Sequence, residues 1–425
     1  MIGFVLFGAL ALFLVLNVPI AVALGLATTT SILYDGRLPM TLIVQRIFVS
    51  NDSFPLLAIP FFMLAGSVMS SGGVSTRLVA FANSLVGWLT GGLAMVVTLT
   101  SMFFAAISGS SAATCAAIGS TMIPAMKEKG YDKEFSAAVI AASGTTGIVI
   151  PPSVTMVVYG VIAGVSIGDL FIGGFGPGVL MGLSMMLLIY FMAKKRGYVG
   201  EKRANAKQII TTFKDSIWGL LMPVIILGGI YGGIFTPTEA AAVAAIYGLV
   251  VGLFIYKELK LKDLPQIITS AIISTAVVMF IMDAAGLFSW IITSNRIPQN
   301  LAAYFLEVTK NPNIIMLFIN ILLLIVGTFL NASAAVIILA PILVPVITSV
   351  GIDPVFFGVV MTVNMAIGTI TPPVGVDLFV AQTVSGVSLE RITKLIWPFM
   401  LILIVDLLLI TYIPQIVMFL PNLMK

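Results

Sequence analysis

The sequence predicts an all-α polytopic membrane protein made of two repeats of opposite orientation, each with a re-entrant helical hairpin and a broken helix. Three observations support this fold class: the composition, a motif that occurs twice, and the distribution of the basic residues. Of the 425 residues, 60% are hydrophobic and 9% are charged. Soluble domains carry about 25% charged residues, so we expect this chain to be embedded in a membrane.

The repeated motif reads P-x₅-G-x-D-x₂-F-x₁₁-G-x₃-P-P. Its first copy begins at Pro124 and its second, 221 residues later, at Pro345. The matched pairs are Pro124/Pro345, Gly130/Gly351, Asp132/Asp353, Phe135/Phe356, Gly147/Gly368, Pro151/Pro372 and Pro152/Pro373. Gly and Pro recur in membrane proteins, but this many matches without a gap argue against chance. A duplicated membrane chain with Gly/Pro breaks at corresponding places is typical of a secondary transporter.

Apolar stretches predict the membrane spans, because about 20 apolar residues cross the hydrocarbon core. The first stretch lacks a basic leading segment and is too long for a signal peptide, so we expect a transmembrane helix there. The spans are expected near Ile2–Tyr34, Ser53–Ser70, Glu134–Ala163, Leu170–Ala193, Ile217–Phe235, Thr238–Tyr256, Leu264–Thr293, Pro354–Val384 and Ile396–Phe419.

Two further apolar blocks are expected to form re-entrant hairpins. Gly91–Met126 and Asn313–Val350 are each too long for one helix and too short for two spans with a loop. Small polar residues interrupt each block midway, at Ser108–Ser111 and at Asn331–Ser333. Non-helical backbone is tolerated at membrane depth only where it is buried in protein or lines a watery cavity. We therefore expect these interruptions to be buried hairpin tips.

The basic residues set the orientation of the spans. In this layout 16 of the 21 Lys and Arg residues fall on one side, which the positive-inside rule makes cytoplasmic. The first hairpin then enters from the cytoplasm and the second from outside, so the repeats are inverted. We expect the first repeat at 1–193, a basic loop and linker helix at 194–235 and the second repeat at 236–425, with hairpins at 91–126 and 313–350 and broken helices at 134–163 and 354–384. The segments Val74–Trp88 and Ile297–Leu306 are expected to be amphipathic arms lying at the interfaces.

The residue types exclude most enzyme chemistry. There is no histidine, so imidazole metal sites and Ser-His or Cys-His pairs are impossible, and the single cysteine, Cys115, is expected to be a small buried packing residue. Carboxylates at expected membrane depth are few and far apart, at Glu239, Asp283, Asp377 and Asp406. Glu239 ends T-P-T-E, which is typical of a helix capping box. We expect no enzyme activity, no organic cofactor and no nucleic-acid partner.

Each broken helix carries a double proline inside a span. Proline lacks an N–H and disfavours helix in the residue before it, so upstream carbonyls lose their helical partners. One such break could be an ordinary kink, but two at repeat-equivalent positions, each beside a polar hairpin tip, favour oxygen-lined sites for a hard cation such as Na⁺. We expect a first sodium site from Ser108, Ser110, Gly147, Ile150 and Pro152, and a second from Gly327, Gly368, Thr371 and Val374.

The hairpin tips are expected to hold the substrate between them. Helix N-termini expose N–H donors that suit a carboxylate, and hydroxyl and amide side chains can bind a polar acid without adding negative charge. The expected substrate contacts are Ser110, Ser111, Ser153, Asn331 and, from outside the hairpins, Arg296. For Arg296 an interfacial anchor is an equal alternative. Small residues at the tips also allow close helix packing, and Ala112, Ala113, Ala116 and Ala117 are expected to do only that.

Four motifs resemble the large membrane subunit of TRAP (tripartite ATP-independent periplasmic) transporters. They are N-V-P at Asn17, T-P-T-E-A-A-A at Thr236, G-x-x-x-N-A-S at Gly327 and G-x-I-T-P-P-V-G at Gly368. The resemblance covers essentially the whole chain and is strongest to the sialic acid member. It implies an elevator-type, Na⁺-driven carrier in the bacterial inner membrane that takes a carboxylated solute from a periplasmic substrate-binding protein, beside a separate small four-helix membrane subunit and membrane lipids. The family commonly has Asp where this chain has Asn331, and Asn where it has Asp377.

Other functions remain open alongside sialic acid uptake. They are C4-dicarboxylate uptake, a stand-alone Na⁺/carboxylate carrier of similar architecture, and a channel with the hairpins as its filter. For a carrier, we expect residues 91–165 and 313–388 to move as one body against the rest. Each ion site is shared between a tip and a broken helix, so separating them would remove half of the ligands.

Overall fold

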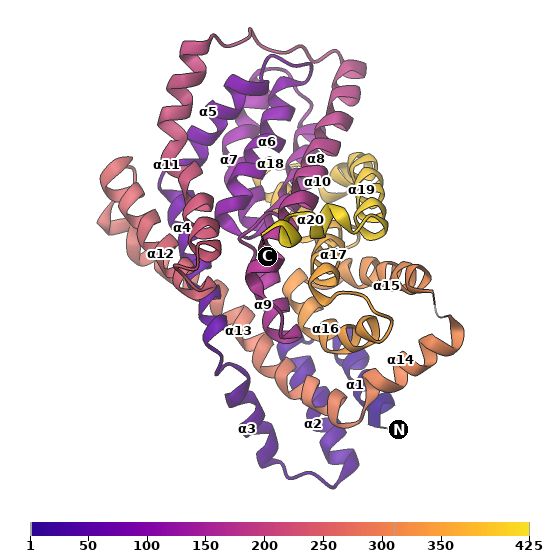
Figure 1. The fold of residues 1–425 in the computed structure, drawn as a ribbon. Helices are drawn as coiled ribbons and strands as arrows, with labels where there is room; N and C mark the ends of the chain where they lie inside the picture. The colour runs from indigo at the N-terminus through magenta and orange to yellow at the C-terminus, as the bar shows by residue number, and fades with distance from the viewer. Residues whose placement is uncertain (1, 310, 425) are drawn as a thin grey trace.

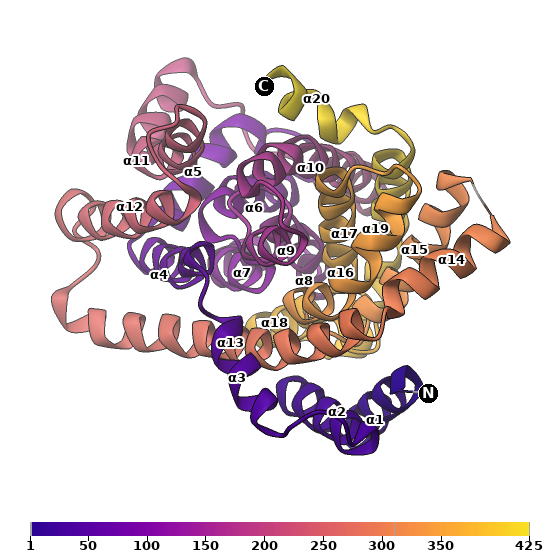
Figure 2. The same cartoon turned by 60° about the horizontal axis from the view of Figure 1, so that its bottom comes forward.

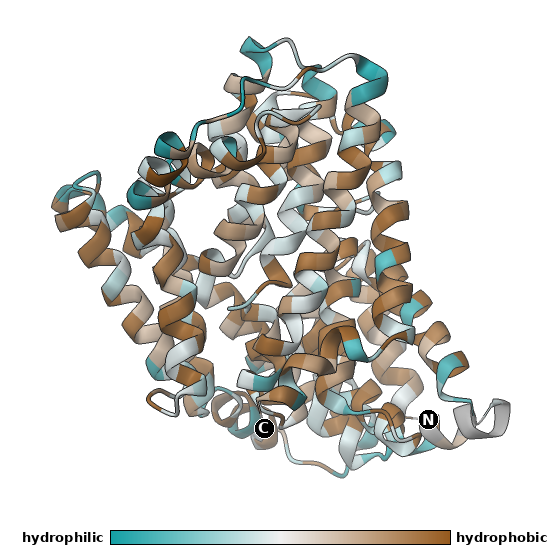
Figure 3. Cartoon of the chain, turned by 45° about the horizontal axis from the view of Figure 1, so that its top comes forward, coloured by the Kyte–Doolittle hydropathy of each residue, from teal (hydrophilic) through white to brown (hydrophobic). Residues whose placement is uncertain are grey.

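The computed structural model describes residues 2–309 and 311–424, and its regular elements are all helical (Figure 1). Seven stretches of helix are long and apolar enough to cross a membrane: Phe54–Ser71, Ile167–Arg196, Ala206–Tyr231, Pro237–Ile255, Leu261–Ser294, Ala332–Ser349 and Leu389–Tyr412. Hydrophobic residues cover these helices, whereas hydrophilic residues gather in end loops such as the one joining α10 (Ile167–Arg196) to α11 (Ala206–Tyr231) (Figure 3). This distribution is that of a multi-pass membrane protein.

The first predicted span is two helices rather than one. α1 (Ile2–Val15) and α2 (Ile20–Asp35) pack against each other, and the chain turns back at Asn17, whose φ of 60° lies in the left-handed region. The N–H of Val18 donates to the Phe13 carbonyl, which closes the last turn of α1. Pro19, which cannot extend the helix before it, begins the second arm. The length of the apolar stretch does not reveal this turn, because Asn17 and Pro19 barely lower the mean hydropathy of the stretch.

The first predicted hairpin is present and is tightly turned. α6 (Gly92–Ser108) ends at Gly109, which has a φ of 63°, and α7 (Ser111–Glu128) begins directly after its N-cap, Ser110. Glycine fits this left-handed position, because it has no Cβ to make a positive φ unfavourable. The Ser110 hydroxyl accepts a hydrogen bond from the Ala113 N–H. The polar interruption is therefore the tip, as predicted.

The second hairpin uses the same capping at its tip. α15 (Pro312–Gly327) and α16 (Ala332–Ser349) meet at Thr328–Asn331, and the Asn331 side chain caps α16 by accepting from the Ser333 N–H. Ser110 and Asn331 are related by the same 221-residue offset as the sequence motif. The two arms of this hairpin contact each other less than those of the first, because α15 packs chiefly against the neighbouring broken helix.

Both predicted broken helices are broken at their double prolines. In the first, α8 (Lys133–Gly144) runs into the short 3₁₀ turn η2 (Thr145–Ile148), and α9 (Val154–Ala163) follows the break. In the second, α17 (Pro354–Gly368) and α18 (Val376–Ser385) flank the break. The missing N–H groups of the prolines explain why neither helix continues.

The two repeats pack across each other. The second arm of the first hairpin, α7, packs against α18 of the second broken helix, and the second arm of the other hairpin, α16, packs against α9 of the first. This exchange brings the two hairpins and the two broken helices into one core. α10 and α19 (Leu389–Tyr412) pack on the broken helices of this core. The predicted span Ile396–Phe419 is wrong at its end, since the chain breaks after Tyr412 and α20 (Gln415–Leu423) turns back onto α10.

A second group of helices surrounds this core. It comprises α3 (Thr41–Ser50), η1 (Phe54–Leu57), α4 (Ala58–Ser71), α5 (Val74–Val86), α11, α12 (Pro237–Val250), η3 (Val251–Ile255), η4 (Leu261–Asp263), α13 (Leu264–Ser294) and α14 (Ile297–Val308). α13 crosses one face of the molecule, with α1–α3 on its outer side and α4 and α16 on its inner side (Figure 2). The predicted arms correspond to α5 and α14, each directly before a hairpin.

Candidate cation and substrate sites

The first hairpin tip lies directly against the first helix break. The Gly109 carbonyl accepts a hydrogen bond from the Val154 N–H at 3.4 Å. A Cβ added at Gly147 would lie 2.5 Å from the Ser110 carbonyl oxygen and 2.7 Å from Thr114 Oγ1. Real Cβ contacts are never this short, so the absence of a side chain at Gly147 allows the tip and the break to meet. The structure therefore brings Ser110 and Gly147 together, as the first sodium site requires.

Hydroxyl groups surround this contact. Ser108 Oγ lies 2.8 Å from Thr114 Oγ1, and the Thr114 hydroxyl is also within donating distance, 2.9 Å, of the Ser110 carbonyl. Both side chains are buried. Sequence reasoning missed Thr114, although its position four residues after the predicted ligand Ser110 places it one helical turn along α7.

The break also leaves carbonyl oxygens free. In the described part of the chain, the carbonyls of Gly147, Ile150 and Pro152 accept no backbone hydrogen bond. Unpaired buried carbonyls are costly unless another donor or a cation meets them. The residues predicted for the first sodium site thus include three carbonyls without a backbone partner and two serines of the adjacent tip.

The second break also contacts its hairpin closely, at Gly327, the last residue of the first arm. A Cβ added at Gly368 would lie 2.6 Å from the Gly327 carbonyl oxygen and 2.7 Å from the Gly327 Cα. The remaining predicted ligands differ from those of the first site. The Gly368 carbonyl already accepts from the Thr371 N–H, the Thr371 hydroxyl donates to the Ile367 carbonyl at 2.7 Å, and Val374 is 37% exposed. This second region is more open and more internally bonded than the first.

The predicted substrate residues divide into two groups. Ser110 is partly exposed and lines a cavity, and Asn331 is exposed at its tip. Ser111 is buried at the start of α7. Ser153 is fully buried, donates to the Ile148 carbonyl at 2.6 Å and accepts from the Met156 N–H, so its hydroxyl stabilises the break. This geometry argues against substrate contact by Ser153 in this conformation.

Arg296 lies far from the first tip. It is exposed at the turn between α13 and α14, and it is not among the residues that line the cavity. Ser274, the cavity residue nearest to it along α13, is more than five helical turns away, or about 30 Å at 1.5 Å per residue. The role of an interfacial anchor fits this position better than substrate contact.

A cavity of about 700 Å³ separates the first tip from α4 and α13. Serine and glutamine side chains line its outer wall, and the alanines of α7 line its inner wall. The lining residues are Met63, Gly66, Ser67, Ser70, Ser71, Ser108, Ser110, Ala112, Ala113, Ala116, Ala117, Leu259, Asp263, Gln266, Ile267, Ser270 and Ser274. The prediction that the four alanines only pack helices together is therefore wrong. Their small side chains also leave room for this cavity.

α4 approaches the hairpin most closely at Gly66, at the inner end of the cavity. A Cβ added there would lie 3.2 Å from both the Cα and the carbonyl oxygen of Ser108. Sequence reasoning missed this outer wall altogether. The close spacing of Ser67, Ser70 and Ser71 along α4 was the available signal, because i and i+3 positions share a helix face.

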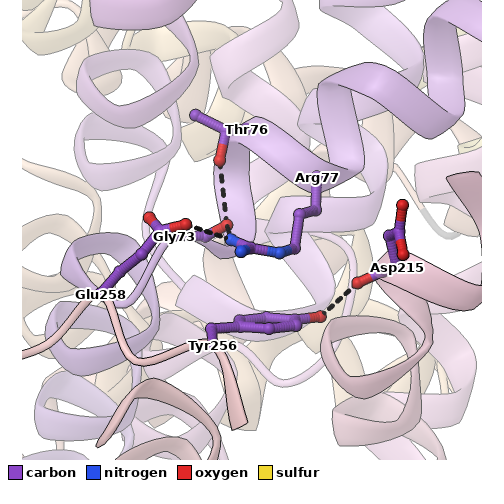
Figure 4. A network of polar contacts seen from close by, with 6 residues as sticks. All are labelled: Gly73, Thr76, Arg77, Asp215, Tyr256 and Glu258. Atoms are coloured by element: carbon purple, nitrogen blue, oxygen red, sulfur yellow. Dashed lines mark hydrogen bonds and ion pairs between the residues drawn. The ribbon is translucent and has the colours of Figure 1, made fainter.

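Arg77 connects the arm α5 to the outer helices. Arg77 Nη1 donates to Glu258 Oε1 at 2.6 Å and to the Gly73 carbonyl at 2.7 Å, and its guanidinium lies 3.9 Å from the centre of the Tyr256 ring (Figure 4). The Tyr256 hydroxyl in turn donates to the Asp215 carbonyl on α11. These contacts connect the beginning of α5 to the segment after η3 and to α11.

Two acidic residues have the roles expected from their surroundings. The capping box at Thr236 is confirmed, since Glu239 accepts from the Thr236 N–H while Thr236 Oγ1 accepts from the Glu239 N–H. Glu201, in the loop after α10, contacts Lys129 at 2.9 Å, and this contact lowers the pKa of the Glu201 carboxyl.

Cys115 is a buried free thiol, which confirms its packing role.

Known proteins resemble the chain over nearly its whole length. Residues 7–416 match the family described as the tripartite ATP-independent periplasmic transporter, DctM component. The C4-dicarboxylate TRAP transporter large permease DctM of Pseudomonas aeruginosa is 44% identical over 94% of each chain. The sialic acid TRAP transporter large permease SiaM of Vibrio cholerae is 38% identical over 98% of each chain.

Two further similarities add to this. An isethionate TRAP transporter permease, DctMQ of Oleidesulfovibrio alaskensis, is 50% identical over 98% of this chain, which spans 66% of that relative's length. The crystal structure of the Alcanivorax borkumensis YdaH transporter matches with a TM-score of 0.65 and 18% identity, covering 88% of this chain and 87% of that one, which shows a shared fold. The relatives are named as permeases and not as enzymes. The chain is therefore a multi-pass protein of the bacterial inner membrane and belongs to the DctM family of TRAP transporter large permeases.

Proposed function

We propose that this chain is the carrier subunit of a Na⁺-coupled uptake system for a small organic acid, working by an elevator mechanism. The observation that carries the proposal is the contact of each hairpin tip with a broken helix, at Ser110–Gly147 and at Gly327–Gly368. Tips and breaks expose backbone groups at membrane depth, which is the arrangement secondary transporters use for ions and anionic solutes.

The chemistry of the two contacts fits Na⁺. The groups that face each other are carbonyl and hydroxyl oxygens, and hard cations prefer such ligands. At the first site, Ser108, Ser110 and the carbonyls of Gly147, Ile150 and Pro152 would hold the ion, with Thr114 as an added hydroxyl. At the second, the carbonyls of Gly327 and Val374 accept no backbone hydrogen bond in the described chain, so they would be the main ligands beside Gly368 and Thr371.

The solute is best described by its acid group. The relatives are named for isethionate, C4-dicarboxylates and sialic acid. The solute would lie in the cavity beside Ser110, where hydroxyl and backbone N–H donors can bind a sulfonate or carboxylate. Sialic acid remains one candidate. Isethionate and C4-dicarboxylates are the others, and the name of the 50% identical relative supports testing isethionate first.

The packing supports a moving body larger than residues 91–165 and 313–388. α10 and α19 contact the broken helices far more than the outer helices, so we include both in the transport body. The cavity would then lie between this body and the static α4 and α13. It contains Asp263 and Leu259, next to a loop with three lysines, so it would open toward the cytoplasm in an inward-facing state.

The proposed partners follow from the family. The tripartite family name and the DctMQ fusion support a small membrane subunit and a periplasmic binding protein beside this chain. The exposed apolar face of α1–α3, which lies outside α13 (Figure 2), would then contact lipid or that subunit.

Uptake into proteoliposomes tests this function. The chain is reconstituted with its small subunit, and labelled isethionate, succinate and sialic acid are supplied with or without the binding protein, under an inward Na⁺ gradient. We expect concentrative uptake of one acid, and only with the binding protein present. Uptake without the binding protein would indicate a stand-alone carrier, whereas flux that neither saturates nor concentrates the solute would indicate a channel. Either result would contradict the proposal.

A further inference from the structure

Asp377 is a carboxylate enclosed entirely by protein. It is the second residue of α18, directly after the second break, and its exposed fraction is 0%. α18 packs against α7 and α8 of the first repeat, so Asp377 lies where the two repeats meet. Ionisable groups at membrane depth are costly and are retained mainly where they have a function.

Within the described residues, the hydroxyl groups of Thr369 and Ser111 lie beside the carboxylate, and no positive charge pairs with it. Its Oδ2 lies 2.7 Å from Thr369 Oγ1, and its Oδ1 has no hydrogen-bond partner. The Thr369 hydroxyl also lies 2.7 Å from the Ala366 carbonyl, and its single proton can serve only one of the two acceptors. None of the ion pairs between described residues includes Asp377. A buried carboxylate needs pairing with positive charge to offset its desolvation.

Oxygen atoms from both repeats surround the carboxylate. A Cβ added at Gly144 would lie 3.3 Å from the Ser111 carbonyl oxygen and 3.5 Å from Asp377 Oδ2, so both oxygens face the same glycine. That Cβ would also lie 3.0 Å from the Cβ of Cys115. The Cys115 thiol is directed to the Asp377 backbone carbonyl at 3.6 Å, so it does not compete for the carboxylate.

We propose that Asp377 is the anionic ligand of a third Na⁺ position, separate from the two tip-to-break sites. Its other ligands would be the Thr369 hydroxyl and the Ser111 carbonyl, beside the backbone of Gly144. The inference rests on the proposed Na⁺-coupled transport and adds one coupling ion to it. Because the ligands come from both repeats, an ion here would also hold the repeats together in the moving body.

The test compares two matched removals of a buried carboxylate. Asp377→Asn removes the charge at the proposed position, and Asp406→Asn removes a buried carboxylate on α19, whose own partner is Ser184. Both variants are reconstituted with the small subunit and the binding protein. The number of Na⁺ ions carried per solute is measured from reversal potentials. We expect this number to fall by one in Asp377→Asn and to stay at the wild-type value in Asp406→Asn.

A second variant and a binding measurement keep the test independent of folding. Gly144→Ala keeps the carboxylate but places a methyl group between the Ser111 carbonyl and Asp377 Oδ2, 3.3 Å and 3.5 Å away, and we expect the same loss of one Na⁺. In detergent, Na⁺ should raise the melting temperature of Asp377→Asn and of Gly144→Ala less than that of the wild-type complex. An unchanged number of Na⁺ ions per solute in both Asp377→Asn and Gly144→Ala would overturn the third site. A loss of one Na⁺ in Asp406→Asn as well would also overturn it. Loss of a coupled proton with the Na⁺ count intact would also overturn it. Wild-type transport that ignores Na⁺ would contradict the proposed function itself.

Discussion

Gly147 lies so close to Ser110 that a Cβ on the glycine would stand 2.5 Å from the serine carbonyl oxygen. A Cβ on Gly368, the matched glycine of the second repeat, would stand 2.6 Å from the Gly327 carbonyl oxygen. In both repeats a backbone carbonyl of the hairpin lies against the glycine of a broken helix. Ser110 is the N-cap of the second hairpin arm, whereas Gly327 is the last residue of the first arm, so only the glycine side of the contact is repeat-equivalent. The close approach on that side explains why both copies of the sequence motif have glycine at this position.

Gly147→Ala should abolish Na⁺-dependent uptake while the protein remains in the membrane. The added methyl would force the tip away from the break, because the atoms it meets are a backbone carbonyl and a short buried side chain. Gly228→Ala on α11 is the matched control, since a Cβ there meets nothing within 4 Å. Initial uptake rates and surface expression are compared for both. Wild-type uptake by Gly147→Ala would mean that the close contact is not needed.

Ser110→Ala should raise the Na⁺ concentration that gives half-maximal uptake. The substitution removes a proposed ligand and also a helix cap, and loss of a cap costs about 1 kcal/mol in stability. Ser166→Ala separates the two effects, because Ser166 caps α10 by accepting from the Asp169 N–H and lies outside the sites. We expect Ser166→Ala to lower the melting temperature without changing the Na⁺ dependence. If Ser110→Ala and Ser166→Ala show the same Na⁺ dependence, Ser110 is not a ligand of the first sodium site.

Asn331→Ala should impair uptake and leave the protein folded. The Asn331 amide is exposed at the second tip, where its oxygen caps α16 and its nitrogen is available to a bound acid. Asn331→Ser keeps a capping oxygen, so comparing the two variants distinguishes capping from solute binding. The measurement is the solute concentration for half-maximal uptake at saturating Na⁺. An unchanged value in Asn331→Ala would contradict this placement.

Crosslinking should distinguish elevator movement from rocking halves. In a Cys115→Ser background, a flexible bifunctional reagent joins cysteines placed at Ser67 and Ala113, which line opposite walls of the cavity. A second pair, Gly119 and Val384, lies within the proposed moving body, where a Cβ at Gly119 would meet Val384 at 3.3 Å. We expect the first crosslink to stop uptake reversibly and the second to have little effect. If the second blocks uptake as completely, the body does not move as one unit.

The sequence predicted the hairpins, the breaks and the capping box at Thr236 because each has a local cause. A double proline removes N–H donors wherever it stands, and T-P-T-E combines a capping oxygen with a glutamate three residues later. The turn at Asn17 and the break after Tyr412 were missed, because both interrupt apolar stretches without lowering their hydropathy much. The cavity wall formed by Gly66 and the α13 serines was missed for another reason. It depends on which helices pack together, and no local pattern states that.

Asp377 shows the same limit of prediction from local sequence within the candidate site. Its position after the second break was evident in the sequence, but its role stayed ambiguous. Only the packing of α18 on α7 and α8 places it beside Ser111 and Gly144, more than 230 residues earlier in the chain. Contacts between the two repeats determine the surroundings of Asp377. These contacts follow from the exchange of hairpin arms and not from residues near Asp377 in the sequence.

The dependence of uptake on Na⁺ tests the central proposal, that the two tip-to-break contacts bind coupling ions. The initial rate of solute uptake is measured in proteoliposomes that contain the complete transporter, as external Na⁺ replaces choline at constant ionic strength and pH. We predict no uptake in choline and a sigmoidal rise with Na⁺, with a Hill coefficient above one. The rise should become shallower in Thr371→Val, which removes a ligand from the second contact. Uptake that is equal in choline and Na⁺, or that follows a proton gradient instead, would contradict the proposal.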